Sequence, residues 1–528
     1  CGVSASRQHV QEKEIGQYSY SKHCYLVLVA VEAVSAPVAV EAKVTVNPVF
    51  SDNMVLQRGM SVPVWGAADA GEEVTVKFAG QTKTAKAGAD GKWSLKLDEM
   101  KASAKAQTMT IGAVTFKDVL IGDVWVGSGQ SNMAGGAGGY ARRDEGLKKI
   151  IQAAPYPLLR LCRGNRPGWK QADAKNAQGF SALLLSFGAP LQKELGVPVG
   201  LIVGAVGGTP SGRWLSPEAF EADAACQAAA KAHNAKTNSE AAMKKYEEAM
   251  KKWKIAADAA KAAKKRGPRK PRPPQQAKAR GDLFIAHIRP VIPYAIRGVV
   301  WDQGESRTQV AGVDQFTVMG ALIRGWRTEW KQDFPFIYIQ KPSGGGCAWD
   351  KKDNPVTNQA SDYSANLPQS LRNDGDYRYL HVRIMQHANT FMAISSDLGS
   401  GVHPMNKSGY GLRACRVALG AAYGKDVEYY GPLYDSHKIE GATIRVSFTH
   451  VGKGLAFKGG DKLTGFQIAG ADGKFEWADA KIDGKTVVLT CEKVSKPTAA
   501  RYAWARQRPW ANLFNKDGLP AIAFETKN

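Results

Sequence analysis

The fold is decided by the stretch Val119-Leu120-Ile121-Gly122-Asp123-Val124-Trp125-Val126, which leads into Gly127-Ser128-Gly129-Gln130-Ser131-Asn132-Met133. The first half is a long, mostly apolar run, typical of a strand that is buried on both faces. The second half is a glycine-rich turn that opens a helix. Later apolar runs end in the same way, at residues 201–203, 298–301, 336–339 and 391–394, and amphipathic helical patterns lie between them, as over 313–331 and 406–423. Strands that alternate with helices predict a parallel sheet covered by helices on both faces.

Shorter runs of alternating apolar and polar residues flank this α/β pattern. Over residues 43–116 they are separated by glycine-rich turns, which predicts a small N-terminal β-sandwich. Over residues 426–528 the alternation returns and predicts a C-terminal β-rich domain. The central α/β domain then spans residues 117–425. Within it, residues 217–280 are rich in Lys and Ala and end in a basic, proline-rich loop, so we interpret them as a helical insertion.

The insertion carries much of the positive charge of the chain. The whole chain has a net charge of +23, and between Lys244 and Arg280 there are 14 Lys or Arg against 3 Asp or Glu, a local charge of 14 − 3 = +11. Tyr246, Met250 and Trp253 follow a helical spacing, which predicts a hairpin that packs on itself or on the core. No helix-turn-helix, zinc finger or aromatic RNA-binding pattern accompanies the charge, so we expect no nucleic-acid partner. A solvated basic face and adhesion to acidic polymers or anionic surfaces both stay open.

Residues 1–42 are interpreted as an N-terminal extension with an export signal. Lys22 and His23 precede an apolar run from Cys24 to Val40, which resembles the basic and apolar regions of a secretory signal. We therefore expect a secreted or periplasmic protein, with a lipidated Cys1 as the alternative. No other segment is apolar and long enough to span a bilayer, so no stable membrane insertion is expected.

The cysteines give no sign of a metal site or of a disulfide framework. The chain has seven of them, at positions 1, 24, 162, 226, 347, 415 and 491, with no C-x-x-C pair and no metal-ligand spacing. We expect no metal and no cofactor.

Ser131 is the strongest candidate for a nucleophile. It stands where the buried strand gives way, through two glycines, to a helix, and this lifts its hydroxyl off the edge of the sheet. Its own N–H group points outward there and suits the stabilisation of an oxyanion. The local string lacks the second glycine of G-x-S-x-G, so the elbow of the α/β-hydrolases is not matched. The alternative is a serine that merely caps the helix.

His403 is the candidate general base, because it lies in the loop after the last predicted parallel strand. Asp397, six residues earlier, is the candidate for the carboxylate that orients it. Gly208 and Gln303 end two other strands and could complete an oxyanion hole with Ser131. Each of three of these residues also has a purely structural interpretation: His403 as a surface histidine, Gly208 as part of a tight turn and Gln303 as the source of a loop hydrogen bond. In a parallel α/β sheet the carboxyl ends of the strands meet at one edge, so these groups are expected to converge.

Four blocks of the sequence together resemble the sialate O-acetylesterase family of the SGNH-hydrolase superfamily. In chain order they are Gly122-Asp123-Val124-Trp125 with Ser128-Gly129-Gln130-Ser131-Asn132-Met133, then Gly207-Gly208-Thr209-Pro210 with Trp214, then Arg297-Gly298-Val299-Val300-Trp301-Asp302-Gln303-Gly304-Glu305-Ser306, and finally Asp397-Leu398-Gly399 with His403-Pro404-Met405-Asn406-Lys407. The likeness covers nearly everything from residue 43 onward except the insertion.

The resemblance implies a flavodoxin-like, three-layer SGNH core that hydrolyses acetyl esters on sugars without a metal. Ser131 would attack the acetyl carbonyl, with His403 as the base, and an acetyl-enzyme would then be cleared by water. Ser131, Gly208 and Gln303 would hold the oxyanion. The substrate contacts would come from residues near the nucleophile and at the ends of the neighbouring strands: Gln130, Asn132, Trp214, Asp302 and Glu305.

Two positions depart from the family pattern. Many SGNH enzymes place the triad acid three residues before the histidine, and here that position is Ser400. We assign the acid to Asp397, with a backbone carbonyl such as that of Gly401 as the alternative. Asp302 stands where many relatives carry Tyr, and this leaves the contacts to the sugar open.

The sequence therefore predicts a carbohydrate O-acetylesterase with an acetylated glycan as its substrate. Fragments of plant or algal polysaccharide are the favoured glycans, while the basic insertion would favour O-acetylated sialic acid or a uronic-acid polymer. Two other functions are kept as alternatives: a non-catalytic carbohydrate-binding protein on an esterase fold, and a lipase-like esterase of broader acyl range. Intact Ser131 and His403 speak against the first, and the lack of a long apolar lid segment speaks against the second.

Overall fold

The computed structural model describes residues 44–526 except 238, 276, 353 and 372–374. The predicted export signal lies outside the described residues. No helix among those described is long and apolar enough to cross a membrane.

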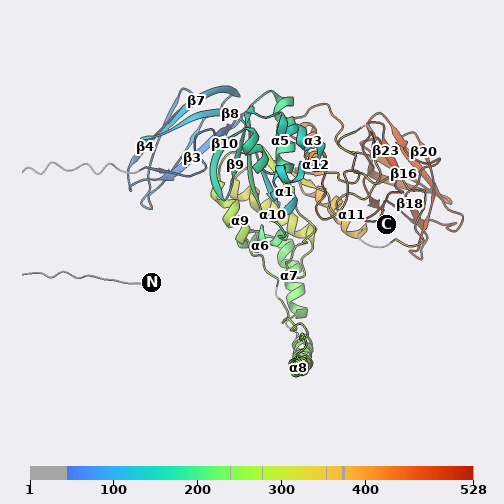
Figure 1. The fold of residues 1–528 in the computed structure, drawn as a ribbon. Coiled ribbons are helices and arrows are strands. Elements are labelled where there is room, and N and C mark those ends of the chain that lie inside the picture. Colours follow the sequence, from blue (N-terminus) through green and yellow to red (C-terminus); the bar gives the residue numbers. More distant parts are fainter. Residues whose placement is uncertain (1–43, 238, 276, 353, 372–374, 527–528) are drawn as a thin grey trace, which may run out of the picture. The chain divides into compact units, whose positions relative to one another are not determined.

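A mostly parallel sheet forms the centre of the fold (Figure 1), as the alternation of strands and helices predicted. Its strand order is β10-β9-β11-β8-β12-β13-β14. The bounds are β8 Val114–Gly129, β9 Tyr156–Arg163, β10 Arg166–Ala172, β11 Val199–Ala205, β12 Gly298–Asp302, β13 Phe336–Ile339 and β14 Thr390–Ala393. All neighbouring pairs in this order are parallel except β10 with β9, so the other strands end at one common edge.

Helices pack on both faces of this sheet because successive strand residues point to opposite sides. Trp125 of β8 packs edge-on against Phe187 of α5 (Ala182–Leu195), with ring centroids 5.0 Å apart. Trp301 of β12, which lies beside Ser128 in register and so faces the other side, packs edge-on against Trp326 of α10 (Gln315–Trp330), at 5.9 Å.

The remaining helices outside the insertion are no longer than the 11 residues of α12. They are α1 Ser131–Ala134, α2 Ala137–Tyr140, α3 Glu145–Gln152, α4 Ala174–Gly179, α9 Asp282–His287, α11 Gly375–Arg383 and α12 Lys407–Val417, with 3-10 turns at Ser211–Arg213, Arg289–Val291 and Ile384–Gln386 and a π-helical turn at Ala418–Ala422. The expected helices over 313–331 and 406–423 are therefore present, and the second of them is α12 continued by the π-helical turn.

The N-terminal strands share their core with the central sheet. They are β1 Thr45–Val46, β2 Val55–Gln57, β3 Val62–Ala67, β4 Glu73–Phe78, β5 Gln81–Lys86, β6 Lys92–Leu97 and β7 Ser103–Ile111. Strand β8 pairs with β7 and β2 over its first half and enters the central sheet over its second half. The expected boundary between residues 116 and 117 thus falls inside one strand, and one buried apolar cluster spans both regions.

The C-terminal strands form smaller sheets around a second buried cluster, which includes Ile444, Phe466, Leu489, Tyr502 and Phe524. The strands are β15 Leu433–Glu440, β16 Thr443–Thr449, β17 Leu455–Phe457, β18 Phe466–Ala469, β19 Phe475–Trp477, β20 Asp479–Asp483, β21 Thr486–Thr490, β22 Ala499–Tyr502, β23 Leu513–Asn515 and β24 Phe524–Glu525. They pair as β15-β16-β21-β20, β17-β23 and β19-β18-β22-β24.

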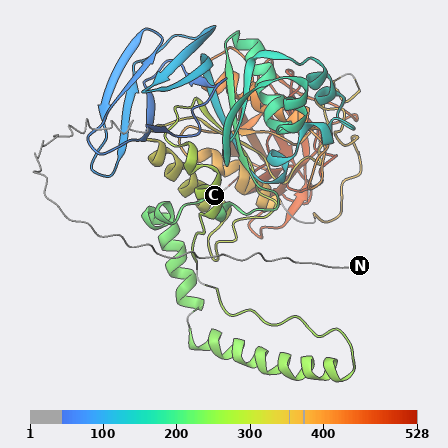
Figure 2. The ribbon, with the colours of Figure 1, turned by 60° about the vertical axis from the view of Figure 1, so that its left-hand side comes forward.

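The insertion consists of three helices and an extended return. The helices are α6 Pro217–Ala222, α7 Ala224–Thr237 and α8 Glu240–Ala262. Figure 2 shows α8 with the extended segment running back beside it. No residue of α8 is fully buried, and the Trp253 indole N–H donates to Pro268 O at 2.9 Å. Trp253 of the apolar stripe therefore packs on the return segment, so the predicted packing of the insertion on itself is made here between a helix and an extended segment.

Candidate active site

Ser131 is the first residue of α1, directly beyond the end of β8. Gly129 takes a φ of +123°, and a Cβ atom there would lie 2.1 Å from the Asp302 carbonyl oxygen. The Gln130 N–H donates to that same carbonyl at 2.8 Å. Only glycine permits this close approach of β8 to β12, and the turn that follows brings Ser131 to the carboxyl edge of the sheet.

His403 lies beside Ser131. Its Nε2 atom is 2.9 Å from Ser131 Oγ, although 272 residues separate the two in the chain. The structure thus brings the predicted nucleophile and the predicted base within hydrogen-bond distance. The His403 side chain is exposed and Ser131 is half-buried, so both are open to a ligand.

A shallow depression of about 600 Å³ opens at this pair, and Tyr140, Gly207 and Met405 are among its lining residues. A Cβ atom on Gly207 would lie 3.6 Å from Ser131 Cβ, so the loop after β11 forms the wall nearest the nucleophile. Gly208 follows with a φ of +70°. Among the described residues no acceptor is recorded for the backbone N–H of Ser131 or of Gly208, so both are available to an oxyanion.

Asp397, the predicted triad acid, is committed to another partner. Its two carboxylate oxygens accept from Arg413 of α12 at 3.1 and 3.0 Å, and the pair is buried. Among the described residues, the hydrogen bond recorded for the His403 ring is the one to Ser131. The structure therefore places Asp397 in an ion pair beneath the loop and does not bring it to His403.

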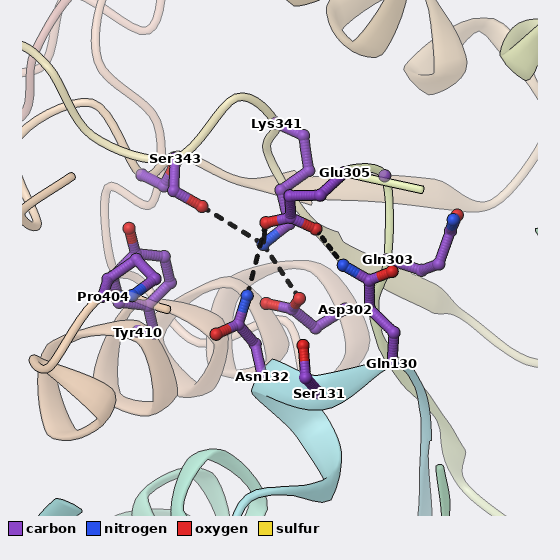
Figure 3. A network of polar contacts seen from close by, with 12 residues as sticks. Gln130, Ser131, Asn132, Asp302, Gln303, Glu305, Lys341, Ser343, Pro404 and Tyr410 are labelled. Atoms are coloured by element: carbon purple, nitrogen blue, oxygen red, sulfur yellow. Dashed lines mark hydrogen bonds and ion pairs between the residues drawn. The ribbon is translucent and has the colours of Figure 1, made fainter. Parts of the chain in front are cut away.

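Gln303 is likewise engaged elsewhere. Its amide nitrogen donates to Arg307 O at 2.9 Å and to Thr209 O at 3.3 Å, and its Oε1 atom accepts from Gln315 at 3.0 Å. Figure 3 shows its side chain directed away from Ser131. Both amide protons are used, so Gln303 fixes the loops and is not placed to hold an oxyanion.

Trp214 was expected to contact the substrate, but it is fully buried. Its indole N–H donates to Thr209 Oγ1 at 3.1 Å, and its ring packs edge-on against Trp301 with centroids 6.0 Å apart. A large aromatic in this position stabilises the core and cannot stack on a sugar.

A buried charged network lies directly behind the nucleophile (Figure 3). Lys341, which follows β13, places its Nζ atom 2.8 Å from Asp302 Oδ1 and 2.9 Å from Glu305 Oε1. Burial raises the pKa of Asp302 above its usual value, and the Lys341 ammonium opposes that rise. Burial alone would lower the pKa of Lys341, but the two carboxylates raise it, so Lys341 stays charged. Asp302 is thus a buried counter-charge and is not exposed to a ligand.

Glu305 connects this network to both neighbours of the nucleophile. It accepts a short hydrogen bond from the Gln130 amide and a second one from the Asn132 amide, at 3.3 Å. The side chains of Gln130 and Asn132 therefore turn toward the network and not into the depression. These three residues, expected to bind the substrate, brace the turn that carries Ser131.

Lys407 extends the network to the loop that carries His403. Its Nζ atom donates to Asn132 Oδ1 at 2.8 Å and to the carbonyl of Pro404. The Asn132 amide nitrogen in turn donates to the carbonyl of Val402 at 3.1 Å. The carbonyl groups on both sides of His403 are thus tied to the residue that follows Ser131, and we call Asn132 and Lys407 the clamp.

Burial lowers the pKa of Lys407 to about 7, and the nearby charge of Lys341 acts in the same direction while Asp302 opposes it. Lys407 also lies over the ring of Tyr140, 4.4 Å from its centroid. Sequence reasoning missed the roles of Lys341 and Lys407. Lys407 stands in the last family block, four residues after His403, but nothing in the sequence indicated that Lys341 reaches the same place.

Comparison with known proteins finds esterases that are similar to this chain. Residues 121–263 match the family model described as carbohydrate esterase, sialic acid-specific acetylesterase. The sialate O-acetylesterase of Rattus norvegicus is 26% identical over 521 residues, covering 86% of this chain and 88% of the relative. The human sialate O-acetylesterase is 25% identical and covers 86% of each chain.

Among solved structures, a carbohydrate acetylesterase from Xanthomonas citri superposes with a TM-score of 0.69 and 26% identity, covering 92% of this chain and 100% of that one. The predicted resemblance is confirmed at the level of family model, relatives and fold. The chain is a carboxylic ester hydrolase, and it is similar to the sialate O-acetylesterases over most of its length.

Proposed function

We propose that the chain removes acetyl groups from carbohydrate, with Ser131 as the nucleophile and His403 as the general base. The observation that carries this proposal is the 2.9 Å distance between Ser131 Oγ and His403 Nε2 at the edge of an open depression. A base at this distance can accept the hydroxyl proton as the oxygen attacks. The relatives named above are acetylesterases, and this supports acetate as the acyl group.

The reaction proceeds in two halves. Ser131 Oγ forms a bond to the acetyl carbonyl carbon while its proton passes to His403 Nε2. The tetrahedral oxyanion is held by the N–H groups of Ser131 and Gly208. As the intermediate collapses, the sugar oxygen leaves with the proton from His403, and Ser131 is acetylated. Water then gives a proton to His403 and attacks the acetyl group, acetate leaves, and Ser131 recovers its proton.

The clamp supplies the orientation that a triad acid supplies in other enzymes. The Asn132 amide and the Lys407 amino group hold the carbonyls of Val402 and Pro404, so the backbone on both sides of His403 is fixed relative to Ser131. Asn132 is adjacent to Ser131 in the chain, so the nucleophile and the base are attached to one rigid unit. The clamp therefore acts on the reaction through His403, because a misplaced base loses much of its effect.

The substrate is an acetylated glycan bound over the depression. The exposed His403 and the open wall at Gly207 suit a substituent on a bulky sugar better than a long acyl chain, which needs an enclosed apolar tunnel.

We would measure acetate release from p-nitrophenyl acetate, from acetylated xylan and from O-acetylated sialic acid, beside hydrolysis of p-nitrophenyl esters with longer acyl chains. The proposal predicts turnover of acetyl esters, loss of turnover in His403→Ala, and little turnover of long acyl chains. Glycan binding without acetate release would contradict it, and faster turnover of long-chain esters would point to the lipase-like alternative.

A further inference from the structure

The proposed reaction makes no use of the most strongly charged part of the chain. This part, residues 239–280, comprises α8 and the extended return segment, and we call it the arm (Figure 2). Between Lys244 and Arg280 it carries 14 Lys or Arg against 3 Asp or Glu. In its described residues one ion pair to a carboxylate is recorded, between Arg280 and Asp282 at 3.6 Å. The remaining positive charges repel one another and are free for an external anion.

The lysines of α8 form an exposed face opposite the apolar stripe. Lys244 and Lys251 are seven residues apart, as are Lys245 and Lys252, and all four are exposed. Seven residues of α-helix advance by roughly 10 Å, and the 23 residues of α8 span roughly 34 Å. An elongated polyanion lying along this face can therefore meet one lysine after another.

The aromatic residue of the apolar stripe of α8, Trp253, is already in contact with the return segment. The Trp253 indole donates to Pro268 O at 2.9 Å, and Lys270 lies 5.5 Å from the centroid of its ring. A helix that binds a membrane surface inserts its apolar face between lipids, and here the largest side chain of that face, Trp253, is occupied by the return segment. The same contact leaves Trp253 unavailable as a stacking platform for the bases of a nucleic acid.

The arm is anchored to the loop that borders the nucleophile. His233 and Asn234 of α7 hold the return segment, through a hydrogen bond between His233 Nε2 and Gln275 O at 2.8 Å and one from Ala277 N–H to Asn234 Oδ1 at 2.9 Å. Arg280 N–H then donates to Gly212 O at 3.0 Å. Gly212 lies four residues beyond Gly208, so the base of the arm and the wall of the depression belong to one loop.

From these observations we propose that the arm binds a polysaccharide rich in carboxylate groups, a polyuronate being the model. The assignment of a carbohydrate rests on the proposed function, whereas the requirement for negative charge comes from the arm itself. A glycan chain held on the arm is retained close to the esterase site while its acetyl groups are removed.

The test compares two variants with the same loss of charge. The arm variant carries Lys→Gln at positions 244, 245, 251, 252 and 254, because Gln keeps a helix propensity close to that of Lys. The control variant carries Lys→Gln at five exposed lysines of the N-terminal strands and their loops: Lys77, Lys86, Lys96, Lys101 and Lys105. Binding of labelled polygalacturonate is followed by fluorescence anisotropy at increasing salt, with dextran as a neutral polymer.

We expect the wild type and the control variant to bind polygalacturonate equally, with an affinity that falls as salt rises. The arm variant should bind about tenfold more weakly or worse at low salt and show a shallower salt dependence, because fewer counterions are displaced. No measurable binding by the wild type, equal losses in both variants, or tighter binding of duplex DNA than of polygalacturonate would each overturn the proposal. Binding needs no turnover, so the result is independent of whether acetate is released.

Discussion

Lys407→Met tests the clamp without breaking the fold. The pKa of Lys407 lies at about 7 instead of 10.5, so burying its charge costs about 5 kcal/mol at or below neutral pH. The substitution removes that cost. It also removes two hydrogen bonds and leaves the buried acceptors on Asn132 and Pro404 unpaired, which costs about 2–6 kcal/mol in all. The two effects largely offset one another, so the free energy of unfolding should fall by no more than about 1 kcal/mol or rise by no more than about 3 kcal/mol.

The effect on catalysis should be much larger than the effect on stability. Without Lys407 the Pro404 carbonyl is released and Asn132 loses the partner that orients its amide toward Val402. His403 then shifts relative to Ser131, and a displacement of about 1 Å costs about 10²-fold in rate. The loss should appear in kcat with little change in KM, because Lys407 lies behind the depression and is not among its lining residues. Met retains the length of Lys and a favourable contact with the Tyr140 ring.

The assay is steady-state hydrolysis of p-nitrophenyl acetate, with urea unfolding measured on the same preparations. Lys425→Met is the matched control, because Lys425 is exposed, follows α12 and loses the same charge. The control should keep wild-type kcat. A folded Lys407→Met protein with wild-type kcat would refute the clamp, and so would a fall in kcat that only matches the fraction of unfolded protein.

Three further predictions follow from the buried groups. Asp397→Asn leaves Arg413 buried without its counter-charge and should cost about 3–5 kcal/mol of stability. The kcat of this variant, measured well below its unfolding temperature, should stay within about tenfold of the wild-type kcat. A loss of about 10⁴-fold would instead identify Asp397 as the triad acid. Trp214→Ala should cost about 3–5 kcal/mol as a core cavity and leave KM for an acetylated oligosaccharide unchanged, and a raised KM would place Trp214 at the substrate after all. Between pH 7 and 10.5 Lys407 is mostly deprotonated in the folded protein and protonated in the unfolded chain, so the wild type gains stability as the pH rises. The stability of the wild type relative to Lys407→Met, measured by urea unfolding, should therefore rise from pH 7 to pH 10 by on the order of 4 kcal/mol. A difference that does not change with pH would contradict the lowered pKa of Lys407.

The fold was predictable because its signals are local. A strand buried on both faces must be apolar along its whole length, so β8, β11 and β12 stand out in the sequence, and glycines mark the turn after β8. The parallel arrangement of the strands then brings Ser131 and His403 to the same edge of the sheet, independently of the conformation of the loops between them. The boundary near residue 116 was harder to place, because β8 serves both the N-terminal strands and the central sheet and leaves no break in the pattern.

The partners of the buried polar groups were not predictable in the same way. Asp397 lies six residues before His403 in the chain. The sequence does not reveal, however, that Arg413 of α12 binds the Asp397 carboxylate in the folded protein. Gln303 pairs with Gln315 of α10 for the same reason. These contacts arise from tertiary packing between residues that are too far apart in the chain to belong to one motif. They determine which polar side chains face the substrate and which support the loops.

The central claim, that Ser131 carries the acetyl group, is tested most directly by comparing acetate release from an acetylated glycan by the wild type and by Ser131→Ala. Ser131 is half-buried and its recorded side-chain hydrogen bond is to His403, so the variant should fold as the wild type does. We predict a loss in kcat of about 10³-fold or more, the scale expected when the nucleophile of such a pair is removed. A Ser131→Ala protein that releases acetate at the wild-type rate would contradict the account.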